Sequence, residues 1–205
     1  ASVEYYQEQQ KMQAYQVDRP QGNFKNVTAK KSKDQQIYVM VIGESTSRKH
    51  LGIYGYPRET TPNFQRRKDE LLIYPDILST SATTIQSLKK ALTLNNFKNP
   101  TQESTLIQLM NQAGFETHWI SNQKPVGIYD SFVTQMAKAS DYYTFKNTTI
   151  YSSVTPFDEV LLPHYETALK SDADKVFIAV HLLGTHAKYK YRYPPQFDHF
   201  KGKTP

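Results

Sequence analysis

The fold of this chain is decided by the stretch Ile37-Tyr38-Val39-Met40-Val41-Ile42-Gly43-Glu44-Ser45. It is an unbroken run of β-branched and apolar residues that ends at a glycine and then at a carboxylate. Such a run predicts a strand buried on both faces at the centre of a parallel sheet. Ligands of open α/β sheets bind beyond the carboxyl ends of the strands, where Glu44 is the first polar side chain. Glu44 is therefore either a site residue or an ordinary solvated residue after a strand.

Strands and helices alternate along the rest of the chain. The sequence predicts further strands over 71–78, 115–120, 142–145 and 175–183. It predicts helices over 62–68, 84–92, 101–113 and 131–139, and another after 155 that Pro163 kinks. This alternation is typical of a βαβ architecture. We therefore expect an α/β domain over 36–205, with a mostly parallel central sheet and helices on both faces. Residues 1–35 are expected to form an N-terminal tether or linker helix that packs loosely on this domain.

Composition narrows the class of protein only partly. A chain of 205 residues suffices for one domain with a sizeable core. It contains no cysteine, which excludes a disulfide framework and a thiolate metal site. No apolar run approaches the length of a membrane span. The net charge of +6 predicts attraction to anions, for which nucleic acid, anionic lipid and lipopolysaccharide are all candidates.

The segment around Thr84 opens a helix. Thr83 with Gln86 has the spacing of a capping box, and apolar residues follow at helical intervals. If Thr83 is the N-cap, Thr84 occupies the first helical position, beside unpaired N–H groups that attract phosphate. The alternative is a run of serine and threonine that only caps the helix. Sequence pattern alone leaves both interpretations open.

Two histidines flank the end of the last predicted strand. His181 lies within that strand and is expected to be a hydrogen-bonded core residue. His186 follows the strand end, so it should reach the same edge of the sheet as Glu44. The first and last strong strands therefore each deliver a polar residue of ligand type to that edge.

Four motifs stand in a fixed order along the chain. The first is Val41-Ile42-Gly43-Glu44-Ser45 with Gly52-Ile53-Tyr54-Gly55-Tyr56 and Thr60-Thr61-Pro62-Asn63, and the second is Thr83-Thr84. The third is Phe157-Asp158-Glu159-Val160-Leu161-Leu162, and the fourth is His181-Leu182-Leu183-Gly184-Thr185-His186 followed by Tyr191-Arg192-Tyr193-Pro194. Together, from about Tyr38 to Phe200, they resemble the phosphoethanolamine transferases of the alkaline phosphatase/sulfatase superfamily.

The resemblance implies an alkaline phosphatase/sulfatase-like fold that is incomplete in this chain. It implies the periplasmic catalytic domain of a bacterial inner-membrane protein, whose N-terminal membrane anchor is absent here. The implied reaction transfers phosphoethanolamine from phosphatidylethanolamine to lipopolysaccharide through a covalent phospho-threonine. Nucleic acid is not an implied partner. The cysteine-free helix start resembles the branch that modifies the lipopolysaccharide core more than the disulfide-rich branch that modifies lipid A.

The resemblance also assigns roles to individual residues. Thr84 is the implied catalytic nucleophile, and Glu44 and Thr84 are the implied zinc ligands. His186 would bind the transferred phosphoryl group of the substrate, with Asn122 as a further substrate-binding residue. These residue types suit the chemistry, because a free threonine hydroxyl is a poor nucleophile at neutral pH until a metal lowers its pKa. Zinc accepts both carboxylate and hydroxyl oxygen.

The chain departs from the family pattern at one point. The family has a further Asp-His pair, followed by Gly and Glu, downstream of the histidine signature, and these residues complete the metal site. Asp198 and His199 lack the following Gly-Glu and are rejected as that pair. We therefore expect this chain alone to bind zinc weakly and to be inactive, because two oxygen ligands are too few for tetrahedral zinc. The shortened sheet should also expose an edge or an apolar face, which favours a homo-oligomer.

Two other functions fit the same sequence. One is a related phosphodiesterase, a sulfatase-type hydrolase or a glycerol-phosphate transferase on the same fold. The other is a non-catalytic domain that binds anionic envelope components through its basic tracts. One such tract comprises Lys188, Lys190 and Arg192, which would suit an acceptor that carries phosphates or would simply be outward charges on a strand edge.

Overall fold

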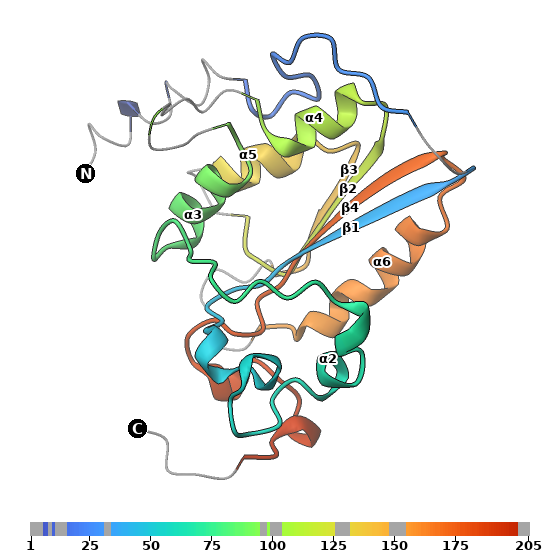
Figure 1. The fold of residues 1–205 in the computed structure, drawn as a ribbon. Helices are drawn as coiled ribbons and strands as arrows, with labels where there is room; N and C mark the ends of the chain where they lie inside the picture. The colour runs from blue at the N-terminus through green and yellow to red at the C-terminus, as the bar shows by residue number, and fades with distance from the viewer. Residues whose placement is uncertain are drawn as a thin grey trace.

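A computed structural model describes residues 6–7, 10, 16–30, 34–94, 98, 104–125, 132–147 and 155–200. At its centre is a four-stranded sheet in the order β1-β4-β2-β3 (Figure 1). The strands are β1 Gln36–Ile42, β2 Glu116–Ser121, β3 Tyr142–Phe145 and β4 Lys175–His181. Every pairing is parallel, so the carboxyl ends of all four strands meet at one edge. The predicted α/β fold with a mostly parallel sheet is confirmed.

Helices cover both faces of this sheet (Figure 1). One face carries α3 Thr84–Ala91, α4 Leu106–Gln112 and α5 Phe132–Lys138, and the opposite face carries α6 Leu162–Leu169. Each face has its own apolar cluster, one around Trp119 and Phe177 and the other around Ile120 and Ile178. Residues alternate between these clusters along β2 and β4 because successive side chains of a strand point to opposite faces.

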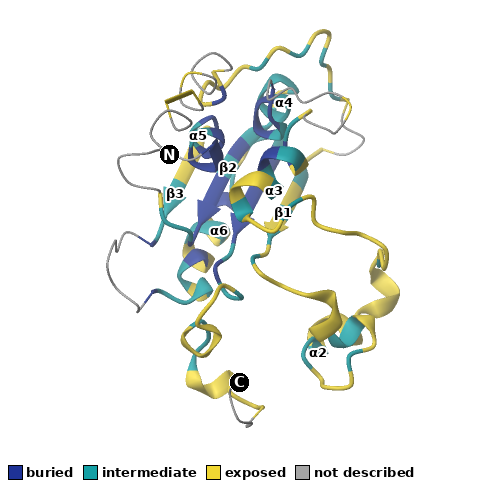
Figure 2. Ribbon diagram, turned by 90° about the vertical axis from the view of Figure 1, so that its left-hand side faces the viewer, coloured by how far each residue is buried: buried dark blue, intermediate teal, exposed yellow. Residues whose placement is uncertain are grey.

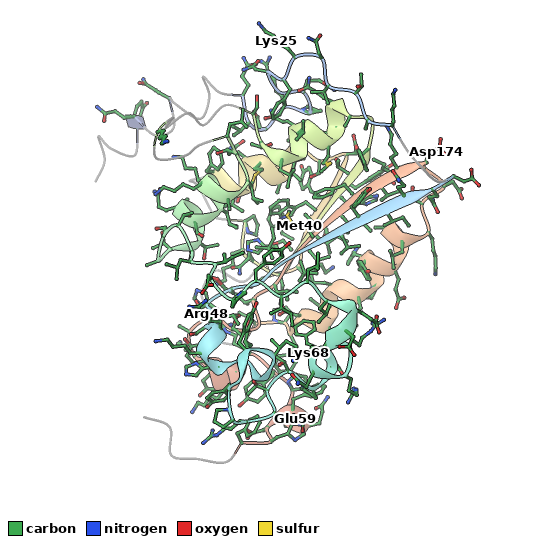
Figure 3. All side chains as sticks on the ribbon, in the orientation of Figure 1. Lys25, Met40, Arg48, Glu59, Lys68 and Asp174 are labelled. Carbon is green, nitrogen blue, oxygen red and sulfur yellow. The ribbon has the colours of Figure 1, made fainter. Side chains whose placement is uncertain are left out.

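Short helices lie mainly in the loops beyond the carboxyl edge of the sheet. The helix α2 is Pro62–Arg66, and the 3-10 helices are Arg48–His50, Gly52–Tyr54, Lys68–Glu70, Asp158–Leu161, Tyr189–Tyr191 and Pro195–Phe197. Arg48 and Glu59 lie in this loop region (Figure 3). Met40, in contrast, packs against the cluster under the three helices.

The expectation that β1 is buried on both faces at the centre of the sheet is wrong. Within the described part of the chain β1 pairs only with β4, so it is an edge strand and β4 is central. Val39 and Val41 are 41% and 60% exposed, while Met40 and Ile42 pack against the apolar cluster. The β1 ribbon accordingly has the colours of exposed and half-buried residues (Figure 2). An apolar run shows that a segment avoids water, but not how many neighbours it finds.

The strand predicted over 71–78 does not form. This segment is a loop with a turn at Pro75-Asp76, and its apolar residues Leu72 and Leu78 are 85% and 80% exposed (Figure 2). Proline cannot donate to a strand ladder, and the segment joins none of the described strands. Apolar composition alone therefore does not predict a strand correctly in this segment.

The helix starts follow the predicted positions but not all of the predicted bonds. Thr83 is the N-cap of α3, yet its side chain makes no capping bond, so the expected box with Gln86 is absent. A capping box does form at Thr105 and Gln108, and it starts α4 five residues later than the predicted position 101. Pro163 lies in the first turn of α6, where the preceding 3-10 helix gives way, so it starts this helix rather than kinking it.

Residues 16–24 are docked on α4 rather than packed loosely. The Gln108 side-chain amide lies 3.1, 3.0 and 3.2 Å from the carbonyl oxygens of Gln16, Arg19 and Gln21. Val17 is 1% exposed. The helix expected over 1–16 falls largely outside the described residues.

Candidate active site

Three segments far apart in the sequence meet at the carboxyl edge of the sheet. Glu44 follows β1, Thr84 is the first residue of α3, and His186 follows β4. All three side chains line one pocket of about 520 Å³. The parallel sheet explains this arrangement, since the ends of β1 and β4 are neighbours in register and Ile42 pairs with His181. The pocket is rich in hydroxyl groups, with Ser79 and Ser87 among its lining residues.

Glu44 and Thr84 are in direct contact. The Thr84 hydroxyl donates a hydrogen bond to Glu44 Oε1 at 2.6 Å and lies 3.2 Å from Oε2. Both residues are half-buried, so the pair is shielded but reachable from solvent. Two oxygens this close fit two positions of a zinc coordination shell. They do not fill it, and among the described residues no group of three or more His, Cys, Asp or Glu could hold a metal.

The loop that carries His186 is tied to the loop that carries Glu44. The hydroxyls of Thr46, two residues after Glu44, and of Thr185, one residue before His186, lie 2.7 Å apart. His186 itself is exposed. Asp198 and His199 do not line this pocket. His186 thus presents an exposed side chain at the pocket that Glu44 and Thr84 also line.

Asn122 lies outside this pocket. It directly follows β2, is 1% exposed, and donates from Nδ2 to the Pro156 carbonyl and to Asp158 Oδ1, both at 2.9 Å. Its side-chain oxygen is buried without a hydrogen-bond partner among the described residues. The structure therefore places Asn122 outside the Glu44–Thr84 pocket, in contact with the segment that precedes α6.

His181 is a core residue, but it is not hydrogen-bonded as predicted. It is 1% exposed and packs edge-on against Trp119 with ring centroids 5.9 Å apart. Neither ring nitrogen has a hydrogen-bond partner in the part of the chain that the structure describes. Burial lowers the pKa of His181 to about 4, because the charged imidazolium is disfavoured away from water. His181 is therefore held as a neutral ring at neutral pH.

The basic tract after His186 is not a strand edge. Its centre is the 3-10 helix Tyr189–Tyr191, and Lys188 has a left-handed backbone conformation. Arg192 is partly buried, and its guanidinium group donates hydrogen bonds to the Ala187 carbonyl and to the Thr155 hydroxyl. Lys188 and Lys190 are exposed beside the pocket loop.

Sequence reasoning missed the residues that support the site. Thr46 and Thr185 link the loop after β1 to the loop after β4. Asp158 links the segment before α6 to the loop after β4. The motif around Phe157 and Asp158 resembles the family, but this resemblance does not predict where the Asp158 carboxyl group lies. An acidic residue at the start of the 3-10 helix before α6 is the sequence signal at Asp158, but it does not reveal which groups the carboxyl group contacts.

Residues 36–205 match the family model described as Sulfatase, so the chain belongs to the sulfatase family. It is strongly similar to two phosphoethanolamine transferases. EptC of Escherichia coli K12 is 38% identical over 192 residues, which are 90% of this chain and 33% of that protein. CptA of Salmonella typhimurium LT2 is 38% identical over 172 residues, which are 81% of this chain and 30% of that protein. The chain spans about a third of the length of these curated relatives.

Solved structures agree with this assignment. The C-terminal periplasmic domain of E. coli EptC, crystallised as a complex with Zn, matches with a TM-score of 0.77 at 35% identity and covers 91% of this chain and 54% of that chain. The integral membrane protein EptA of Neisseria meningitidis, a lipooligosaccharide phosphoethanolamine transferase, has a TM-score of 0.76 at 22% identity. It covers 99% of this chain and 38% of that chain, and it shows the fold alone. The predicted family and the alkaline phosphatase/sulfatase-like fold are confirmed. No helix in the described ranges has the length and apolar character needed to cross a membrane.

Proposed function

We propose that the complete gene product transfers phosphoethanolamine from phosphatidylethanolamine to lipopolysaccharide, with Thr84 as the nucleophile. The single observation that carries this proposal is the 2.6 Å hydrogen bond between Thr84 Oγ1 and Glu44 Oε1 in a pocket that His186 also lines. The similar proteins EptC and CptA are phosphoethanolamine transferases, which supports phosphoethanolamine as the transferred group. The periplasmic location of the E. coli EptC domain supports the same location for this chain in a bacterial inner-membrane protein.

The proposed reaction consists of two successive displacements at phosphorus. First, Thr84 Oγ1 attacks the phosphorus of phosphatidylethanolamine, the phosphorus–oxygen bond to diacylglycerol breaks, and the threonine proton ends on the diacylglycerol oxygen. Then an acceptor oxygen attacks the phospho-threonine, the bond between phosphorus and Oγ1 breaks, and the acceptor proton returns to Thr84. Glu44 accepts the hydrogen bond of the Thr84 hydroxyl and so orients Oγ1.

Zinc is the proposed metal, supported by the Zn complex of the similar E. coli domain. Glu44 and Thr84 would hold it, together with further ligands. When bound, zinc lowers the pKa of the threonine hydroxyl and stabilises developing negative charge. The first turn of α3 adds unpaired N–H groups beside Thr84, and the His186 imidazole can donate to the transferred phosphoryl oxygens.

Transfer is tested in the complete gene product with labelled phosphatidylethanolamine vesicles and purified lipopolysaccharide. Thr84→Ala should abolish labelling of lipopolysaccharide. Gln86→Ala is the control, because Gln86 is an exposed residue of the same helix that does not line the pocket, and it should retain transfer. Equal transfer by the Thr84→Ala protein and the unchanged protein would contradict the proposal.

The same assay separates the two alternative functions. A hydrolase of this family would release labelled phosphoethanolamine into water at the same rate with and without lipopolysaccharide. A non-catalytic binding domain would bind lipopolysaccharide equally well after replacement of Glu44 and Thr84, and it would need no metal.

A further inference from the structure

The half-buried carboxyl group of Asp158 is the centre of a hydrogen-bond cluster behind the pocket. Asp158 Oδ1 accepts from the backbone N–H of Leu183 at 2.9 Å and from Asn122 Nδ2 at 2.9 Å. Asp158 Oδ2 accepts from the backbone N–H of Gly184 at 2.7 Å. One carboxyl group therefore joins the end of β2, the start of the 3-10 helix before α6, and Leu183 and Gly184 in the loop that leads from β4 to His186.

Gly184 shows how closely this carboxyl group and the loop fit together. A Cβ atom added at Gly184 would lie 2.7 Å from Asp158 Oδ2, closer than side-chain contacts allow. The absence of a side chain at position 184 thus permits the backbone N–H to reach the carboxylate. Charge-assisted hydrogen bonds of this kind are about twice as strong as neutral ones.

We propose that Asp158 is a positioning residue that fixes the Leu183–Gly184 turn and thereby presents His186 to the Thr84 pocket. Asn122 supports it by donating to the same carboxyl oxygen. Exposed histidines on unsupported loops sample many orientations, whereas catalytic hydrogen bonds need a fixed donor. This inference rests on the proposed role of His186 in phosphoethanolamine transfer.

The decisive experiment measures His186 directly. In the histidine-labelled 205-residue chain, the six imidazole signals are recorded by NMR, and the His186 signal is assigned with His186→Gln. Asp158→Asn should move and broaden the His186 signal. Glu159→Gln is the control, because it removes the same negative charge from an exposed residue of the same 3-10 helix. It should leave the His186 signal in place.

Turnover in the complete gene product gives the second readout. Asp158→Asn should lower kcat by about ten- to a hundredfold with little change in the KM for the donor, because a loop misplaced by about 1 Å costs that much. A loss confined to KM, or a loss equal to that of Glu159→Gln, would overturn the positioning role.

A double-mutant cycle keeps the inference testable where Asp158→Asn disturbs folding. Gly184→Ala should displace the His186 signal in the unchanged chain, but it should add nothing in the Asp158→Ala background, where the clashing oxygen is gone. Additive displacements, or an unmoved His186 signal in every variant, would overturn the inference. Failure of transfer in all proteins would refute the proposed function alone, since the NMR signal still reports on Asp158.

Discussion

Thr84 and Glu44 are forty residues apart in the sequence, yet the Thr84 hydroxyl donates to Glu44 Oε1 at 2.6 Å. The contact exists because the carboxyl end of β1 and the first turn of α3 face each other across the edge of the sheet. It places the proposed nucleophile and the proposed metal-binding carboxylate in one half-buried position. The chemistry proposed for the sulfatase-family chain depends on this pair.

Glu44→Gln should lower both zinc retention and transfer in the complete gene product. The amide keeps the size of the side chain but loses the negative charge that binds a cation. A metal contributes several kcal/mol of charge stabilisation, so we expect turnover to fall by about a hundredfold or more. Zinc content after dialysis and the transfer rate are measured together. Full zinc content with unchanged turnover would exclude Glu44 as a ligand.

His181→Phe should remove part of the acid sensitivity of the chain. The pKa of His181 is lowered to about 4 in the folded state, against about 6.5 when unfolded. Between these values the unfolded state binds more protons, so the free energy of unfolding falls as pH drops from about 6.5 to 4, by about 3 kcal/mol.

Denaturant unfolding measured from pH 7.5 to pH 4 checks this effect. His199→Phe, at an exposed position, serves as the control and should keep the full pH dependence. The same slope in the His181→Phe chain as in the unchanged chain would show that His181 is protonated in the folded state at these pH values.

Val176→Thr and Val41→Thr form a matched pair on neighbouring strands. Val176 is fully buried in β4, whereas Val41 in β1 is 60% exposed. A buried hydroxyl without a partner costs about 1–3 kcal/mol, so Val176→Thr should destabilise the chain by that amount. Val41→Thr should change the free energy of unfolding by about 0.5 kcal/mol or less. Equal losses in urea unfolding would mean that Val41 is covered in solution, as in a homo-oligomer.

Gln108→Ala should release residues 16–24 from α4. The change removes the capping box with Thr105 and the amide that contacts three backbone carbonyl groups. We expect a loss of about 2–3 kcal/mol and a Tm lower by roughly 5–10 °C. Gln86→Ala, at an exposed position of α3 without the expected capping bond, should leave the Tm nearly unchanged. A Tm loss in Gln86→Ala equal to that in Gln108→Ala would contradict this account.

Much of this architecture was predictable from the sequence, and the misses have physical causes. The parallel strands, the edge that carries Glu44 and His186, and the helix start at Thr84 follow from apolar runs and caps. The exposed side of β1 and the loop over 71–78 could not be predicted, because hydrophobicity does not reveal whether a segment finds a partner. Asp158 was missed for another reason. Its partners are two backbone N–H groups and the Asn122 side-chain amide, which only the tertiary fold brings together.

The most direct test locates the covalent intermediate. The complete gene product is mixed with phosphatidylethanolamine vesicles without acceptor, quenched in acid, digested and sequenced by tandem mass spectrometry. The account predicts one phosphoethanolamine group on Thr84, with none on Thr83, and its loss when lipopolysaccharide is added before quenching. Transfer to lipopolysaccharide with the group on another residue, or undiminished transfer by the Thr84→Ala protein, would contradict it.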